Sequence, residues 1–408
     1  MEQERLKKYA NLIVKCGLNV QKGQEIIIRC GLDQPEFVAM VTEECYKRGA
    51  ERVKVEWSYM PVSKIHLNYK SLETLSEVTD VEKAEWQRKV DKLTCLLWLD
   101  SDDPDGLNGT DSEKISKANM ARYPIIKPYR DTLDNKYQWC IAAVPGKEWA
   151  RKIYPELTDA EAVEKLWEDI LYCSRVDDDP IAAWAKHNEN LAKRCEFLNG
   201  YKFEKLEYKS SNGTDFSVGL NPKGVFQGGG GRTLGTGIYF NANIPSEEVF
   251  TSPMRGIAEG KVVATKPLSY QGKLIENFWF RFENGKVIEL HAERNQDLLE
   301  KMVSMDEGAA YLGECALIAH DSPINNTGIL FYNTLFDENA SCHLALGRGF
   351  NDCLENYEKY SVEECEKLGV NSSMIHVDFM IGSKDMSITG VTKDGKRVQI
   401  FKDGNWVI

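Results

Sequence analysis

Hydrophobic and polar positions follow two different patterns along the chain, and the change comes just before its middle. In the first part, short apolar runs such as 25–29 and 52–56 are separated by segments with helical periodicity, for example 34–48. Strands that alternate with helices are typical of a parallel sheet whose faces are covered by helices. The pattern therefore predicts an α/β domain over residues 1–195.

The second part of the chain is rich in short strands and turns. Asn284-Gly285 lies between the apolar runs 278–282 and 287–290, which is a strong signal for a two-residue hairpin. Near the end of the chain, two Asp-Gly turns separate short strands and indicate an antiparallel meander. Residues 196–408 are therefore predicted to form an α+β domain, which also holds the candidate metal-binding residues described below.

Composition and charge exclude several classes of protein. The 408 residues include 51 Lys and Arg against 63 Asp and Glu, and a net charge of −12 argues against a binder of nucleic-acid phosphates. Hydrophobic residues make up 42% of the chain, enough for a core. No apolar run reaches the roughly 18 residues of a membrane span, and the N-terminal segment has no apolar signal core. We expect a protein that binds neither nucleic acid nor membrane.

The cysteines indicate a reducing compartment. There are 11 of them, an odd number, and none stands in a Cys-x-x-Cys pair. A disulfide framework and a cysteine-based zinc site are therefore not expected. Reduced thiols in a cytoplasmic protein are the prediction.

A glycine run at 228–231 invites comparison with a phosphate-binding loop. It lacks the Gly-Lys-Ser/Thr ending and the strand–loop–helix setting that make such a loop specific. A plain flexible loop is predicted there instead.

One apolar strand places a histidine and an acid on the same face. His376 and Asp378 are two residues apart, so they project together while Val377 and Phe379 face the other way. An imidazole beside a carboxylate can ligate a metal ion. A buried His–Asp hydrogen bond is the alternative from this motif alone, because buried polar groups usually pair.

Two acids and a histidine crowd the segment 335–343, which predicts the start of a helix. Glu338 and His343 are five residues apart, a spacing that does not align them on a regular helix. They converge only if Glu338 lies in the turn before the helix. The alternative is an acidic helix N-terminus with Asp337 or Asn339 as its cap.

Two further acids stand out by their surroundings. Glu314 lies in the otherwise apolar strand 312–318, where a carboxylate is costly unless it is paired with a cation or binds a metal ion. Glu248 follows Pro245-Ser246, an arrangement that is also typical of an ordinary helix start. A structural ion pair for Glu314 and a structural helix start around Glu248 remain open alternatives.

Together these motifs place several carboxylates and two imidazoles in one domain. A bridging carboxylate can serve two ions, so the set predicts a pair of divalent metals. Oxygen and nitrogen ligands without thiolates suit zinc, cobalt or manganese. The candidate residues are Glu248, Glu314, Glu338, His343, His376 and Asp378.

The chain resembles the aminopeptidase T, aminopeptidase S and PepS family of metallo-aminopeptidases over essentially its whole length. The strings that carry the resemblance are GLNVQKGQ at 17–24, NIPSEEVFT at 243–251, LGE at 312–314, NTLFDENA at 333–340 and HVDFMIG at 376–382. The metal ligands that the resemblance implies are Glu248, Glu314, His343, His376 and Asp378. It implies Glu338 beside them as a further ligand or as the base, and a homodimer that encloses its active sites in an internal cavity.

We therefore expect a metal-dependent aminopeptidase that hydrolyses N-terminal residues from peptides through a water activated by two metals. Glu338, or as a second candidate Glu314, takes the proton of this water and passes it to the leaving amine. Acidic groups near the metals hold the α-ammonium of a substrate with a free N-terminus. A nonspecific amidohydrolase is a weaker alternative.

One departure from the family pattern follows His343. Where the family has a tyrosine that is expected to assist catalysis, this chain has Phe350, which carries no hydroxyl. The main alternative is therefore a degenerate homologue that binds metal or peptide with little turnover. Cys315 and Cys342 are expected to be packing residues, because Cys315 points away from Glu314 in a strand and Cys342 lies about 100° from His343 around a helix.

Overall fold

The computed structural model describes residues 3–408, which form two compact units. The first unit contains the residues up to Trp184 together with Gly230–Pro245. The second contains Ala185–Gly229 with Ser246–Ile408. Each unit has its own sheets and its own core.

The sequence predicts a single domain boundary near residue 195, whereas the two units divide the chain at several positions. Residue 195 lies inside helix α9 (Pro180–Tyr201), which continues past the division at Trp184. The later segment returns to the first unit because β10 (Asn243–Ile244) pairs in parallel with β4 (Trp139–Ala143). A strand of two residues is too short to show an alternating pattern, so it could not be predicted from the sequence.

The first unit is built on a parallel sheet, as predicted. Its strand order is β10-β4-β3-β1-β2, and all its pairings are parallel. The remaining strands are β1 (Glu25–Gly31), β2 (Arg52–Ser58) and β3 (Cys95–Asp100), with a separate small pair formed by β8 (Gly231–Arg232) and β9 (Tyr239–Phe240). Buried side chains of the isoleucine run in β1 and of the leucines in β3 explain why these segments read as apolar strands.

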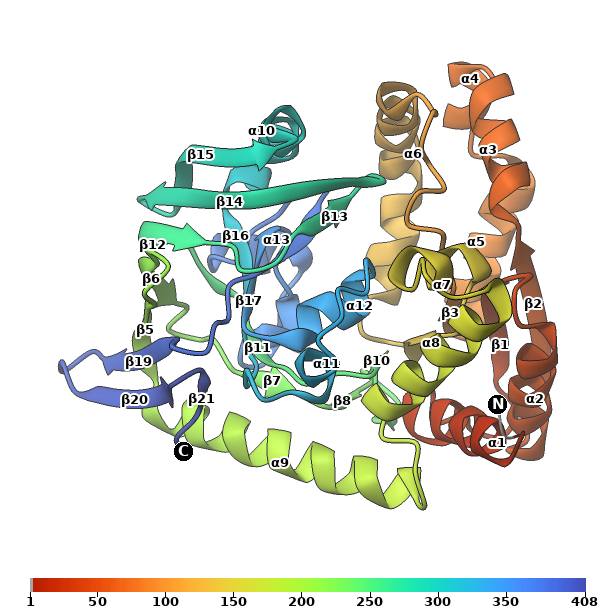
Figure 1. The fold of residues 1–408 in the computed structure, drawn as a ribbon, viewed down its shortest axis with the longest axis horizontal. Helices are drawn as coiled ribbons and strands as arrows, with labels where there is room; N and C mark the ends of the chain where they lie inside the picture. Colours follow the sequence, from red (N-terminus) through yellow and green to blue (C-terminus); the bar gives the residue numbers. More distant parts are fainter. Residues whose placement is uncertain (1–2) are drawn as a thin grey trace. The chain divides into compact units, whose positions relative to one another are not determined.

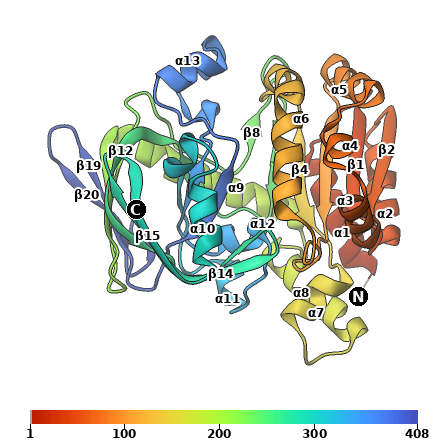
Figure 2. The same cartoon turned by 90° about the horizontal axis from the view of Figure 1, so that it is seen from above.

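Eight helices of the described residues precede α9 in the first unit. They are α1 (Gln3–Leu12), which continues as a π-helical turn (Ile13–Gly17), α2 (Pro35–Lys47), α3 (Met60–Tyr69), α4 (Leu72–Ser76), α5 (Asp80–Lys92), α6 (Ser112–Leu133), α7 (Lys147–Ile153) and α8 (Asp159–Cys173). Tyr9, Phe37 and Trp167 join α1, α2 and α8 through ring contacts of 5.3–6.3 Å between centroids. The helices α4, α5 and α6 form another packed group (Figure 2).

The second unit contains two antiparallel sheets. The larger has the order β13-β14-β12-β6-β5-β19-β20-β21, with β15 paired to β14, and the smaller has the order β18-β17-β16-β11-β7. Strands of the larger sheet are β5 (Phe203–Lys209), β6 (Asp215–Leu220), β12 (Pro253–Val263), β13 (Leu268–Tyr270), β14 (Lys273–Glu283), β15 (Lys286–Arg294), β19 (Ser387–Thr392), β20 (Arg397–Lys402) and β21 (Asn405–Trp406). Strands of the smaller sheet are β7 (Gln227–Gly228), β11 (Val249–Thr251), β16 (Leu312–Leu317), β17 (His343–Gly347) and β18 (His376–Met380).

Short helices connect these strands. They are α10 (Gln296–Val303), α11 (Pro323–Asn326), α12 (Thr334–Asp337) and α13 (Val362–Lys367), and α10 packs on the β14–β15 hairpin (Figure 1). The predicted hairpin at Asn284-Gly285 is confirmed, with both residues at positive φ as the tight turn requires. The C-terminal meander of β19, β20 and β21 is confirmed as well.

The core of the second unit lies between its two sheets. Phe280 of β14 and Phe379 of β18 are in edge contact, with ring centroids 5.0 Å apart. Leu191 and Leu198 of α9 join the same cluster of buried residues. One face of the smaller sheet therefore packs against the larger sheet, and its other face can carry polar side chains.

The glycine run is more ordered than the predicted loop. Gly228 ends β7 and Gly231 begins β8, residues 229–230 form the loop between them, and no helix follows as in a phosphate-binding loop. None of the helices among residues 3–408 combines the length and the hydropathy of a transmembrane segment.

Candidate metal centre

Three adjacent strands of the smaller sheet place two acids side by side. In the antiparallel register, Glu314 on β16 lies opposite Ala345 on β17, and Ala345 lies opposite Asp378 on β18. Glu314 and Asp378 are buried, and Ala345 is fully so. Because the side chain of Ala345 is a single methyl group, no bulky neighbour separates the two carboxylates.

Both candidate histidines project from this same face. His343 precedes Ala345 by two residues on β17, and His376 precedes Asp378 by two on β18. The predicted pairing of His376 with Asp378 on one face of a strand is confirmed, since His376 Nε2 lies 3.3 Å from Asp378 Oδ1.

The predicted helix start over 335–343 is wrong in its second half. Helix α12 ends before Glu338, which lies in a 3₁₀ turn (Glu338–Ala340), and Ser341 is already extended at φ −159°. His343 therefore begins a buried central strand instead of continuing a helix. The turn at Glu338 is what lets it approach His343 despite their spacing.

Glu248 comes from a connection and not from a helix start. Pro245-Ser246-Glu247-Glu248 leads from β10 directly into β11, which pairs with β16 and β7. A Cβ atom at Gly228 of β7 would lie 2.7 Å from the backbone oxygen of Glu248. Gly228 thus allows the close backbone approach that places Glu248, a role that the glycine run in the sequence could have suggested.

Backbone carbonyls fix the orientation of both imidazoles. His343 Nδ1 lies 2.8 Å from the carbonyl oxygen of Glu338, and His376 Nδ1 lies 2.7 Å from that of Arg348. A carbonyl oxygen only accepts hydrogen bonds, so Nδ1 carries the proton in each ring. The Nε2 atoms are directed at the acids, an arrangement typical of metal-ligating histidines.

The side chains form two groups that share Glu314. Glu248, Glu314 and His343 make one group, and Glu314, His376 and Asp378 make the other, with the ligand atoms of each group within 4.8 Å of one another. His343 Nε2 is 3.5 Å from Glu248 Oε2, and His376 Nε2 is 3.1 Å from Glu314 Oε2.

These separations and donor types fit divalent cations. Ligand atoms held at about 2.1 Å from a tetrahedral ion lie about 3.4 Å from each other. Asp378 Oδ1 is buried and accepts no hydrogen bond from the described residues. A set of carboxylates and neutral imidazoles suits zinc, cobalt or manganese.

Burial and the short distances between the carboxyl groups shift the pKa values of several residues in the cluster. Burial, with the charges of Glu314 and Asp378 added, raises the pKa of Glu248 well above its usual range. Burial by itself lowers the pKa of His376, but the carboxylates of Asp378 and Glu314 together outweigh it and raise that pKa well above its usual range. A cation bound here would relieve the repulsion between the carboxylates.

Glu338 lies beside the two groups without belonging to either. Its Oε1 accepts a hydrogen bond from Asn339 Nδ2 at 3.3 Å, and its carboxyl group hydrogen-bonds to Asp378. Burial, then the charges of Asp378 and Glu248, raise the pKa of Glu338 well above its usual range. Glu338 is therefore a buried acid in direct contact with a candidate ligand, Asp378.

Both neighbouring thiols face the core and not the cluster. Cys315 follows Glu314 in β16 and lies among the buried residues between the sheets. Cys342 lies just before β17, not on a helix as expected, and its Sγ contacts the backbone of Ile318 at 3.3 Å. Burial raises the pKa of both thiols, to about 12 for Cys342.

Phe350 forms part of the wall beside His376. Its ring centroid is 4.9 Å from that of His376 and 5.6 Å from that of Phe250. Its backbone N–H donates to Ser252 Oγ at 2.7 Å. The position expected to carry a tyrosine hydroxyl is thus next to a candidate ligand.

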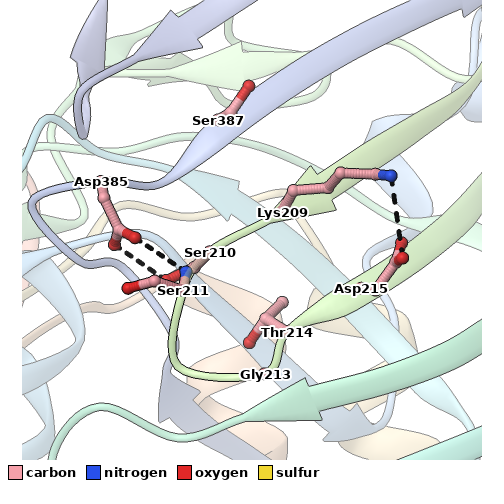
Figure 3. Close-up of a pocket in the computed structure, with 8 residues that line it drawn as sticks. All are labelled: Lys209, Ser210, Ser211, Gly213, Thr214, Asp215, Asp385 and Ser387. Atoms are coloured by element: carbon pink, nitrogen blue, oxygen red, sulfur yellow. Dashed lines mark hydrogen bonds and ion pairs between the residues drawn. The ribbon is translucent and has the colours of Figure 1, made fainter.

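A separate cavity of about 450 Å³ lies at the turn between β5 and β6 (Figure 3). Its Asp385 carboxylate is already satisfied by Ser210 Oγ and the Ser211 N–H, at 2.9 and 2.7 Å. None of the residues that line it belongs to the carboxylate–histidine cluster.

Comparison with known proteins shows which family the chain belongs to. The sequence profile described as thermophilic metalloprotease (M29) matches residues 2–406. The chain belongs to this family. Aminopeptidase AmpS of Bacillus subtilis (strain 168) is 40% identical to it over 99% of this chain and 98% of its own length.

Other relatives match the chain over its full length. Aminopeptidase T of Thermus thermophilus is 37% identical over 100% of this chain and 99% of its own. The solved structure titled wild-type AmpT from Thermus thermophilus matches with a TM-score of 0.91 and 36% identity, covering 100% of both chains. The predicted family and the two-domain α/β fold are confirmed. The predicted enzyme class, a metallo-aminopeptidase, agrees with a metalloprotease family whose relatives are named aminopeptidases.

Proposed function

We propose that the protein removes N-terminal residues from peptides and that it does so with two divalent ions bound to the cluster on β16, β17 and β18. The observation that carries the proposal is the position of Glu314, which belongs to both groups of candidate ligands. A carboxylate shared in this way is the usual bridge of a two-metal site. The proposed ligands are Glu248, Glu314, His343, His376 and Asp378.

When bound, the ions would supply Lewis acidity toward the scissile carbonyl and lower the pKa of the attacking water. Glu338 would take a proton from this water and deliver it to the leaving amine. It is better suited to this role than Glu314, because Glu314 is shared between both ligand groups while Glu338 belongs to neither. A carboxyl group whose pKa is raised by burial is also closer to the pH at which proton transfer is efficient.

Recognition of the substrate would depend on the same surplus of acids. The α-ammonium of a peptide is a cation, and the buried carboxylates of the cluster can pair with it. A blocked amine would leave one of these acids desolvated and without a partner, which disfavours binding. This selects for substrates with a free N-terminus.

Several finer points belong to the same proposal. The oxygen and nitrogen ligands favour zinc, cobalt or manganese. All 11 cysteines are free thiols, which suits a reducing compartment such as the cytoplasm. A homodimer is proposed from the family resemblance.

The proposal is tested by metal analysis and assay of one preparation. We expect close to two divalent ions per chain in the purified protein, loss of activity after chelation, and its return with Zn²⁺, Co²⁺ or Mn²⁺. Leucyl-p-nitroanilide and its N-acetylated form give the matched substrates. Equal rates on both substrates would indicate a nonspecific amidohydrolase, and activity that survives complete removal of metal would contradict the proposal.

A second candidate is a degenerate relative that binds metal or peptide with little turnover. The observation that favours it is Phe350, which places a bare ring beside His376 where the family resemblance implies a hydroxyl. The same preparation distinguishes the two, since this candidate predicts a fully metal-loaded protein that hydrolyses neither substrate.

A further inference from the structure

One fully buried side chain connects two acid-bearing segments of the cluster through a contact that spans 92 positions of the sequence. Asn339 is 0% exposed and lies in the 3₁₀ turn directly after Glu338. Its Oδ1 accepts a hydrogen bond of 2.8 Å from the backbone N–H of Glu247, the residue before Glu248. Its Nδ2 donates to Leu335 O at 2.9 Å and to Glu338 Oε1 at 3.3 Å.

In these contacts both N–H bonds of the amide donate, and its carbonyl oxygen accepts one hydrogen bond. Each polar atom of the side chain thus has a partner, and the side chain itself is fully buried. A buried side chain with every polar group satisfied holds its partners in one arrangement. Asn339 therefore ties the Glu338 turn to the connection that carries Glu248.

We propose that Asn339 is a positioning residue of this site: its amide orients the Glu338 carboxylate and holds the Glu247–Glu248 segment in place beside Glu314 and His343. The inference rests on the proposed function, because an oriented Glu338 matters for rate only if the cluster hydrolyses peptides.

Aspartate at position 339 separates the contact with Glu247 from the contact with Glu338. Asn339→Asp keeps an oxygen for the Glu247 N–H but replaces the donor toward Glu338 by a second acceptor, so the two carboxylates repel each other. We expect kcat to fall by about 10–100-fold, the usual effect of changing a residue that orients a metal site. KM for a short peptide should change by no more than about twofold, because the ligands that hold the substrate remain.

A second readout does not depend on turnover. In the Co²⁺-substituted protein, the visible absorption bands report the geometry of the bound ions. Displacement of Glu338, which hydrogen-bonds to the proposed ligand Asp378, should shift these bands in Asn339→Asp. Asn339→Ala, which introduces no buried charge and removes all three hydrogen bonds, should shift the bands as well and serves if the aspartate variant folds poorly.

Asn221 offers a matched control in the same unit. It is also buried, its Nδ2 donates to Leu368 O at 2.6 Å, and its Oδ1 accepts from the Lys223 N–H at 2.9 Å. Asn221→Asp should lower the melting temperature by an amount similar to Asn339→Asp. It should leave kcat per bound ion and the Co²⁺ spectrum unchanged.

The outcomes separate this inference from the function on which it rests. If both Asn339 variants keep the kcat per bound ion and the Co²⁺ spectrum of the unmodified protein, Asn339 is only a structural residue and the inference is overturned. If the unmodified protein binds Co²⁺ but hydrolyses no peptide, the proposed function fails. The spectra of the two variants then decide the positioning role alone.

Discussion

The ring of Phe350 rests against the imidazole of His376, with 4.9 Å between the centroids and 52° between the planes. Phe250 supports the same ring from another side, at 5.6 Å. Both contacts require only an aromatic ring. Position 350 can therefore gain a hydroxyl without disturbing the packing that keeps His376 in place.

We expect Phe350→Tyr to raise kcat. A hydroxyl there can donate a hydrogen bond to the oxyanion of the tetrahedral intermediate, and one such donor typically changes the rate by about 10²–10³-fold. Metal content and metal affinity should stay the same, because no ligand is altered. Steady-state kinetics with metal analysis of both proteins check this.

Phe350→Leu is the control for the ring itself. It removes the contact with His376 and should lower stability and weaken metal binding. If Phe350→Tyr leaves kcat unchanged while the unmodified protein is already fast, another group supplies the hydrogen bond or none is needed. The absence of a hydroxyl at position 350 then does not limit the rate.

The shared position of Glu314 makes a prediction about stoichiometry. Glu314→Ala should remove both ions, since Glu314 belongs to both ligand groups. Asp378→Ala should remove one ion more readily than the other, because Glu248, Glu314 and His343 remain. Hydrolysis should be abolished in both variants. Metal analysis by inductively coupled plasma spectrometry gives the stoichiometries.

A buried acid outside the cluster provides the comparison. Glu25 is buried in the first unit and paired with Arg88 at 2.5 Å. Glu25→Ala should lower stability, leaving an unpaired arginine, while both ions and the rate per bound ion are kept. Full metal content and full rate in Glu314→Ala would show that the ligand assignment is wrong.

How far the site could be predicted from the sequence depended on local geometry. Within one strand, alternation suffices, so the shared face of His376 and Asp378 and the opposite orientation of Cys315 could be predicted from spacing. The convergence of Glu248 with Glu314 could not be predicted from the sequence, because it depends on the pairing of β11 with β16, which lie far apart along the chain.

The error at His343 has a physical cause. The string His343–Gly347 consists of histidine, leucine, alanine and glycine, with no β-branched residue, and leucine and alanine are strong helix formers. Its position between β16 and β18 in the sheet overrides that preference. The sequence predicts Asn339 only as a possible helix cap, because its contact with Glu247 spans 92 positions of the chain.

The thiols beside the ligands should be irrelevant to metal binding. Cys315 and Cys342 are both buried in the core, and burial raises the pKa of each thiol, which disfavours the thiolate that binds metal. Serine at either position places a polar hydroxyl in an apolar setting and should lower the free energy of unfolding by about 1–3 kcal/mol. Urea unfolding and metal analysis of the two variants test this, and a stoichiometric loss of metal would contradict it.

The small side chain of Ala345 makes the most specific prediction about the cluster. Ala345 lies between Glu314 and Asp378 on the middle strand and contributes no ligand atom. In Ala345→Leu, three more carbon atoms would occupy the space between the two carboxylates. We expect loss of both ions and of hydrolysis although every proposed ligand is still present, together with about 1–3 kcal/mol of destabilisation from overpacking.

Ala345→Gly leaves the space open and should keep both ions, with only about 0.5–1 kcal/mol lost to the greater flexibility of the unfolded chain. Metal content and unfolding of the metal-free proteins, measured side by side, distinguish a filled site from a merely unstable fold. Two ions and full kcat in Ala345→Leu would mean that the ions bind elsewhere than over the middle strand.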